Sequence, residues 1–191
     1  PEEAMKYYDE AIQANPDSLD LARNLSSQAA KAKVFDKAIY YGKKVLESDK
    51  SVNKDLVNMA LIYQEKAVAD TVPETKAAAF AEAISYINKA LEANPTDIVN
   101  LYYKAGIQTA SEPKNNGTAL ETMQALANAI KALPADQQPA YKGTLCYAYQ
   151  YIGLYYNGVK NKQKALEAFK LWLEADPENQ NLQKVIESLS K

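Results

Sequence analysis

A short apolar phrase recurs along this chain, and it constrains the possible fold more than any other feature. The phrase has a small residue, a large apolar residue four positions later, a small or apolar residue three positions further on and usually a closing proline. Clear copies begin at Ala4, Ala83 and Ala165, and weaker copies begin at Ala38 and Thr122. Residues with these spacings share one face of an α-helix, so each copy predicts a helix with one apolar face. We expect the proline to end that helix and to open the first turn of the next one.

Segments of a second kind lie between these helices, with a large residue, a small residue and then an aromatic residue. They read Met59-Ala60-x2-Tyr63 and Ile152-Gly153-x2-Tyr156, with Leu25-Ser26-x2-Ala29 as a reduced version. Small residues let two antiparallel helices approach closely, while aromatic rings fill the space above and below them. This alternation resembles the tetratricopeptide repeat family, whose unit of about 34 residues is a helix A, a turn and a helix B.

The resemblance implies an all-α fold, a right-handed superhelical array of antiparallel helix pairs (an α-solenoid) with about ten helices. It implies one domain, residues 1–191, with units at about 1–18, 19–52, 53–97, 98–136 and 137–178 and a capping helix at 179–191. The first unit holds a helix B only, so we expect a further segment upstream of Pro1.

Three places depart from the regular repeat length. We expect extra residues between two helices around 70–74, a turn near 111–117, and a lengthened start of the next helix at 137–144, with Pro139 in its first turn. Gly42 stands where the family prefers an aromatic residue, so we expect looser packing there.

The residue types that the chain lacks exclude several kinds of site. It has no His and one Cys, Cys146, which excludes His-based triads, HExxH and CxxC zinc motifs and intrachain disulfides. Its six glycines form no phosphate-binding motif, and the net charge is −2 with Arg23 as the one arginine. We therefore expect no catalytic residues, metal or cofactor. We also expect no nucleic-acid partner and no membrane span, since the longest uncharged run, 143–159, is too short.

In tetratricopeptide arrays the A helices line a concave groove that contacts a partner peptide. Carried over by register, the resemblance places these groove residues here: Arg23, Ser27, Lys54, Asn58, Tyr102, Tyr103, Tyr147, Gln150 and Tyr151. One subgroup of the family holds the C-terminal carboxylate of its partner with cationic and amide side chains, and Arg23 and Asn58 fit two of those places.

The helix expected at 138–157 carries six tyrosines, too many for one buried stripe. Tyr149 and Tyr156 fall on the face that the repeat assigns to the core, while Tyr147 and Tyr151, four residues apart, fall together on another face. The second face is either part of the groove, where tyrosine suits a binding surface, or buried in a central helix.

The sequence favours a non-catalytic protein-interaction module or scaffold that binds a partner segment. One alternative is a small-molecule receptor or an enzyme whose insertions at 70–80 and 110–118 close over the groove. Another is a scaffold that self-associates through its open N-terminal end. A cytoplasmic location and a bacterial periplasmic or envelope location are both compatible with the sequence.

Overall fold

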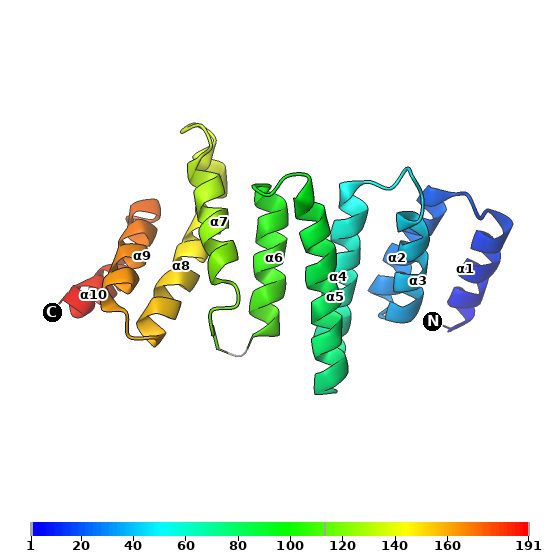
Figure 1. The fold of residues 1–191 in the computed structure, drawn as a ribbon, viewed down its shortest axis with the longest axis horizontal. Coiled ribbons are helices and arrows are strands. Elements are labelled where there is room, and N and C mark those ends of the chain that lie inside the picture. The colour runs from blue at the N-terminus through cyan, green and yellow to red at the C-terminus, as the bar shows by residue number, and fades with distance from the viewer. Residues whose placement is uncertain (1, 113, 191) are drawn as a thin grey trace. The chain divides into compact units, whose positions relative to one another are not determined.

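The computed structural model describes residues 2–112 and 114–190, with side chains from Lys6 onward. Over these residues it holds ten α-helices, one short 3-10 helix and no strand (Figure 1). The α-helices are α1 (Glu2–Ala14), α2 (Leu19–Lys31), α3 (Phe35–Leu46), α4 (Asn53–Ala69), α5 (Pro73–Glu92), α6 (Ile98–Ser111), α7 (Leu120–Lys131), α8 (Lys142–Gly158), α9 (Lys162–Ala175) and α10 (Gln180–Ser190); the 3-10 helix η1 is Gln138–Tyr141. The predicted all-α class is confirmed.

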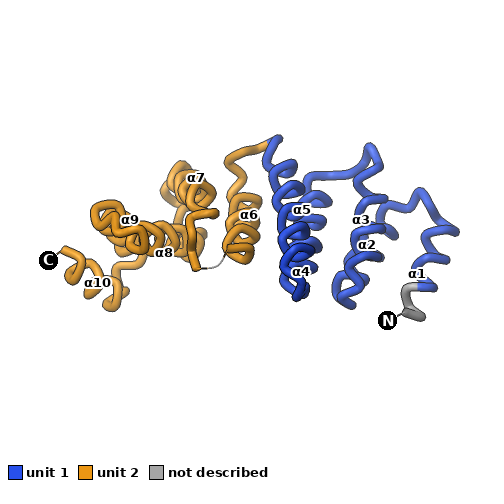
Figure 2. The backbone as a smooth tube through the Cα atoms, turned by 60° about the horizontal axis from the view of Figure 1, so that its bottom comes forward, with its two compact units in different colours: residues 1–93 blue, residues 94–191 orange. Residues whose placement is uncertain are grey.

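The helices form two compact units, residues 1–93 and 94–191 (Figure 2). Within the first unit, α1 to α5 pack in chain order, and within the second unit α6 to α10 do the same. Short connections make successive helices antiparallel neighbours, as expected for helix pairs. The boundary at residue 93 lies close to the repeat boundary predicted at 97. The assignment of residues 1–191 to one continuous array of repeats stays a prediction.

Three prolines, Pro16, Pro95 and Pro177, share one turn geometry between a helix B and the next helix A. The residue before each proline accepts a backbone hydrogen bond from the residue three positions on, at 3.1 to 3.2 Å. That donor residue then caps the next helix with its side-chain oxygen, and these caps are Ser18, Asp97 and Asn179. The prolines therefore lie in the turn, two residues before the cap, and not in the first turn of the next helix as predicted.

The turns from helix A to helix B also repeat, between α2 and α3 and between α8 and α9. Lys33 and Lys160 adopt φ values of 59° and 61°. In both turns the N–H of the next residue bonds back to a carbonyl five residues earlier, at 2.9 and 2.8 Å. This closure satisfies carbonyls at the end of a helix, and glycine is the usual residue at its left-handed position. The same hydrogen-bonded turn therefore recurs between helix A and helix B in two repeats.

Glycine permits a close contact between helices in each unit. A Cβ on Gly153 of α8 would lie 2.3 Å from Cε1 of Phe169 on α9, and a Cβ on Gly42 of α3 would lie 2.3 Å from Sδ of Met59 on α4. Met59 is 1% exposed and occupies the space above Gly42. The helices therefore approach closely at Gly42, contrary to the looser packing expected there.

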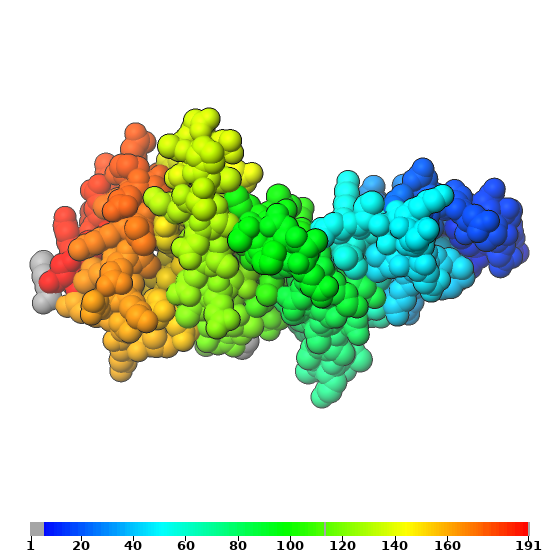
Figure 3. Space-filling model, turned by 45° about the horizontal axis from the view of Figure 1, so that its top comes forward, coloured from blue at the N-terminus to red at the C-terminus, as the bar shows by residue number. Residues whose placement is uncertain are grey.

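The extra residues around 70–74 lengthen two helices and leave a short connection. α4 and α5 have 17 and 20 residues, and only residues 70–72 join them before Pro73 opens α5. The beginning of α5 projects from the first unit in the space-filling view (Figure 3). In the second unit, the extra residues at 137–144 form η1, which holds Pro139, as a separate turn ahead of α8.

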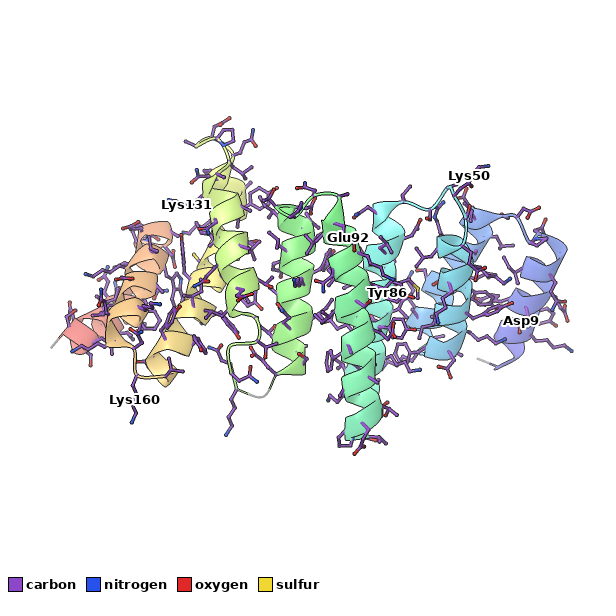
Figure 4. The ribbon with its side chains drawn as sticks, in the orientation of Figure 1. Asp9, Lys50, Tyr86, Glu92, Lys131 and Lys160 are labelled. Carbon is purple, nitrogen blue, oxygen red and sulfur yellow. The ribbon has the colours of Figure 1, made fainter. Side chains whose placement is uncertain are left out.

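A polar contact joins α1 to α3. Asp9 accepts hydrogen bonds from Tyr41 Oη at 2.7 Å and from Lys37 Nζ at 2.6 Å (Asp9 is labelled in Figure 4). The hydrogen bond from Lys37, with a smaller effect from Tyr41, holds the pKa of Asp9 below its usual range. Burial, with a smaller effect from the bond to Asp9, raises the pKa of Tyr41. Ile12, 4% exposed, adds the apolar anchor of α1.

Replacing Gly153 by Ala should destabilise the protein by about 1–3 kcal/mol, because the new methyl group would overlap the ring of Phe169. Gly106→Ala is the matched control inside α6. Apart from its chain neighbours and the backbone of its own helix, no atom of the described residues lies within 4 Å of its Cβ position, and alanine is favoured in a helix by about 1 kcal/mol. Urea unfolding measures both variants, and effects of the same sign would contradict the close approach at Gly153.

Lowering the pH should loosen α1. The pKa of Asp9 is lower in the folded state, so its contribution to stability is complete above its unfolded value of about 3.9 and is lost as the pH falls through the folded value. Asp9→Asn should produce similar loosening at neutral pH. Hydrogen exchange of α1 amides, compared with α8, measures it. Asp36→Asn, which removes the exposed pair with Lys66, is the control. Unchanged protection of α1 in Asp9→Asn would show that apolar contacts alone hold this helix.

Candidate partner-binding site

A hollow of about 230 Å³ opens in the first unit between α2 and α4, beside α3. Its apolar lining includes Val45 and Met59. Three of the predicted groove residues line it together, namely Arg23, Ser27 and Asn58. They meet there because α2 and α4 are both A helices of the predicted repeats. Lys54, the fourth residue predicted in this unit, is exposed in the first turn of α4 and lies outside this lining.

Arg23 is paired with a buried carboxylate at the edge of this hollow. Its Nε and Nη2 donate to the two oxygens of Asp55 at 3.0 and 2.9 Å, and its Nη2 also donates to the carbonyl of Lys50 at 3.3 Å. Asp55 is 5% exposed and also accepts from the Val52 N–H at 2.9 Å, which caps α4. Burial would raise the pKa of Asp55, but the hydrogen bonds from Arg23 and Val52 outweigh it and hold that pKa below its usual range.

This pairing changes what the hollow can bind. Its lining holds two cations, Arg23 and Lys31, and two acids, Asp55 and Glu65, so the charges balance. The guanidinium is already bonded to both oxygens of Asp55. A carboxylate clamp that uses Arg23 would have to compete with this ion pair. The balanced charges therefore favour an uncharged group in the hollow, whose lining also holds Ser27 and Asn58.

Five of the predicted groove residues lie on α6 and α8 in the second unit, and four of them, all but Tyr151, lie on the same faces of these helices. Tyr102 is 47% exposed, and its ring centroid lies 6.2 Å from that of Tyr103 and 6.1 Å from that of Tyr147 on α8. The hydroxyl of Tyr147 lies 3.2 Å from Thr109 Oγ1 in a hydrogen bond between the two helices. Gln150 is exposed one turn further along α8. The structure thus brings the tyrosines of two A helices into contact.

The sequence reasoning missed other residues on the same helix faces. Val99 and Leu154 are 53% and 49% exposed, and nothing lies within 4 Å of a Cβ position on Gly106 or Gly143. The helical register could have identified these residues, because their spacing puts them on the same helix faces as the predicted groove residues. We call the combined surface the uncharged face; it consists of Val99, Tyr102, Tyr103 and Gly106 on α6 and Gly143, Tyr147, Gln150 and Leu154 on α8.

Tyr151 does not share the open surface predicted for it with Tyr147. It is 7% exposed, its hydroxyl donates to the carboxylate of Glu112, and it accepts from the Ala119 N–H at 3.2 Å. Burial, followed by the bond to Glu112, raises the pKa of Tyr151. Tyr151 therefore holds the connection between α6 and α7 in place and presents no free surface to a partner. Tyr149, predicted in the core, is also 7% exposed.

The described residues contain no group of three or more His, Cys, Asp or Glu side chains that could hold a metal ion. Among the helices that the structure describes, none has the length and apolar character needed to cross a membrane. Cys146 is half-buried, and burial raises the pKa of its thiol, which disfavours the reactive thiolate.

Replacing Asp55 by Ala should destabilise the protein by about 1–3 kcal/mol, because Arg23 and the Val52 N–H lose their shared acceptor. Asp20→Ala is the matched control, since Asp20 contacts the same arginine from an exposed position. It should leave the free energy of unfolding almost unchanged. Urea unfolding compares the two. Equal losses would show that Asp55 has no special role at the start of α4.

The chain matches no protein-family model and no curated protein. It does match solved structures. One is the C-terminal part of a TPR repeat-containing protein from Cytophaga hutchinsonii, with a TM-score of 0.74 and 24% identity over 95% of this chain and 65% of that one. This chain thus spans less than two thirds of that structure. Another is MamA, from residue 41 to its end, from Desulfovibrio magneticus RS-1, with a TM-score of 0.58 and 20% identity over 91% of this chain and 84% of that one.

The likeness to these structures extends over almost the whole chain. It agrees with the repeated proline turns, the repeated turns at Lys33 and Lys160 and the glycine contacts between paired helices. The chain is therefore a protein of the tetratricopeptide repeat fold, an all-α solenoid of helix pairs.

Proposed function

We propose that this chain is a non-catalytic protein-interaction module whose A helices hold a segment of a partner protein. The observation that carries the proposal is the uncharged face on α6 and α8. It presents large apolar groups to solvent, with Val99, Tyr102 and Leu154 each about half exposed. A scaffold function is also in keeping with the tetratricopeptide repeat fold.

The chemistry of the uncharged face suits an apolar partner segment. Tyrosine buries a large ring at low conformational cost and keeps a hydroxyl for hydrogen bonding. Gly106 and Gly143 leave open space between the larger side chains, into which partner side chains can fit. The eight side chains include no charged group that would have to be desolvated, a cost that often cancels the gain from burying ions.

The hollow of the first unit offers a second, smaller contact of similar character. Its floor is apolar, its charges balance, and Ser27 and Asn58 can hydrogen-bond a partner backbone. The two surfaces differ in their surroundings, because α2 and α4 carry several charged residues whereas α6 and α8 carry one each, Lys104 and Lys142. The proposal therefore assigns the main apolar contact to the second unit.

Two observations weigh against the alternative function of a receptor or enzyme whose loops close over a groove. The segment 70–80 is mostly helix α5, with a three-residue connection before it. The connection between α6 and α7 is tied to Tyr151 through Glu112 and Ala119.

The test is affinity capture with the whole chain, identification of the captured proteins, and measurement of their binding to variants. Replacing Tyr102 and Tyr147 together by Ala should weaken binding by about 2 kcal/mol or more, roughly thirty-fold in Kd. The matched control is the pair Tyr7→Ala and Tyr40→Ala, which removes two tyrosines of the first unit that are 63% and 47% exposed.

Circular dichroism and urea unfolding establish that both double variants remain folded. Equal binding by the Tyr102/Tyr147 variant and the unmodified chain would refute the assignment to the uncharged face. Equal weakening in the control pair would show that any exposed tyrosine serves, and would refute it as well.

A further inference from the structure

The dipeptide Asn-Gly occurs twice in this chain, at Asn116–Gly117 and at Asn157–Gly158. In such a pair the glycine backbone nitrogen can attack the side-chain amide carbon of the asparagine, because glycine has no side chain to hinder the approach. The sequence alone makes the two sites equivalent. The structure places them in different backbone environments.

We propose that Asn116 is a site of spontaneous succinimide formation and deamidation, and that Asn157 is protected. In the first step the Gly117 nitrogen loses its proton and bonds to Cγ of Asn116, while the Cγ–Nδ2 bond breaks and ammonia leaves. In the second step water opens the ring at either carbonyl and gives aspartate or isoaspartate. Water is the only co-reactant, and no electron transfer is involved.

Two hydrogen-bond donors contact the side-chain carbonyl oxygen of Asn116, where negative charge develops during the attack. Oδ1 of Asn116 accepts from the Thr118 N–H at 3.0 Å and from Thr118 Oγ1 at 2.6 Å. Donors placed at a developing oxyanion lower the barrier of acyl transfer. The same bonds fold the carboxamide back toward the following peptide, which brings the electrophilic carbon toward the nucleophile.

The backbone around Gly117 is fixed in a conformation that favours glycine. Gly117 has φ 101°, and a Cβ there would lie 2.5 Å from the ring of Tyr155. Asn116 itself is exposed, so water can reach the ring and ammonia can leave. The residue that supplies the nucleophilic nitrogen thus directly follows an accessible and polarised amide in the chain.

Asn157 lies in the last turn of α8, where the helix opposes the same reaction. Its backbone carbonyl accepts hydrogen bonds from the N–H groups of Val159 and Lys160, the latter at 3.1 Å. Gly158 is still helical. Ring closure requires rotation of the backbone between the two residues, which would break the end of the helix and its closing turn. We therefore expect a higher barrier at Asn157.

Deamidation at Asn116 would place a new negative charge beside Glu112. Glu112 Oε2 and Asn116 Oδ1 both accept from the Thr118 N–H, at 3.1 and 3.0 Å. Glu112 also accepts from Tyr151, which holds the connection between α6 and α7. Repulsion between two carboxylates at this point would weaken that connection.

The test incubates the whole folded chain at neutral and mildly alkaline pH and follows both sites by peptide mapping with mass spectrometry that separates asparagine, aspartate and isoaspartate. Conversion at Asn116 should be at least about tenfold faster than at Asn157, and faster at the higher pH. In concentrated urea the two rates should become similar. Equal rates in the folded chain would overturn the proposal. It would equally fail if Asn116 were stable in the folded chain while it converts in urea.

Thr118→Val and Thr118→Ser test the role of the hydroxyl donor. Valine has nearly the same shape and keeps the backbone N–H, so conversion at Asn116 should slow several-fold while Asn157 is unaffected. Serine keeps the hydroxyl and should retain the original rate. A valine variant that converts as fast as the unmodified chain would refute the assignment of Thr118 Oγ1 as an activating donor.

Discussion

The structure depends on how closely each helix approaches the next one. An amphipathic helix alone cannot bury its apolar stripe, so each helix here is stabilised mainly by its neighbours in the chain. Gly153 against Phe169 and Gly42 against Met59 are two such close approaches. At both places a methyl group would overlap a buried side chain. At Gly153 the small residue of the repeat is therefore a steric requirement and more than a helix preference, whereas Gly42 stands at a position where the family prefers an aromatic residue.

Close packing between helices would be of little use if the helix ends were unsatisfied. Polar side chains at the turns supply the missing partners, and they do so at repeated positions. Ser18, Asp97 and Asn179 cap three helices after equivalent proline turns. Asp55 caps α4 and also pairs with Arg23 across to α2. The one arginine of the chain is therefore part of the scaffold, and the proposed binding surface consists of uncharged groups.

The candidate binding surface is a consequence of the same helix geometry. Once one side of α6 and α8 is used for packing, the residues at the remaining helical positions must face away from the core. Tyr102 and Tyr147 meet across these two helices because A helices of successive repeats are neighbours in space. An extended apolar surface of this kind on a folded domain is typical of an interaction site.

The helices and their pairing could be predicted from the sequence. Apolar spacing and the small residues of the repeat are local properties, so they predict helix faces and close contacts without knowledge of the fold. It also placed Arg23, Ser27 and Asn58 on one side of α2 and α4, because register alone fixes the face of a helix on which a residue lies. The prolines were predicted in the first turn of the next helix, but they lie in the turn before its cap. A backbone hydrogen bond forms that turn, and residue spacing does not reveal it.

Which polar and aromatic groups are free depends on contacts that form in the folded protein. Tyr147 and Tyr151 are both tyrosines and lie four residues apart on α8. Tyr151 is nevertheless buried, because the connection between α6 and α7 folds over it and bonds to it through Glu112 and Ala119. Arg23 is bonded to Asp55, 32 residues away in the chain. These outcomes depend on contacts between segments distant in sequence, and the free energy of such contacts comes from burial and hydrogen-bond geometry that no local pattern encodes.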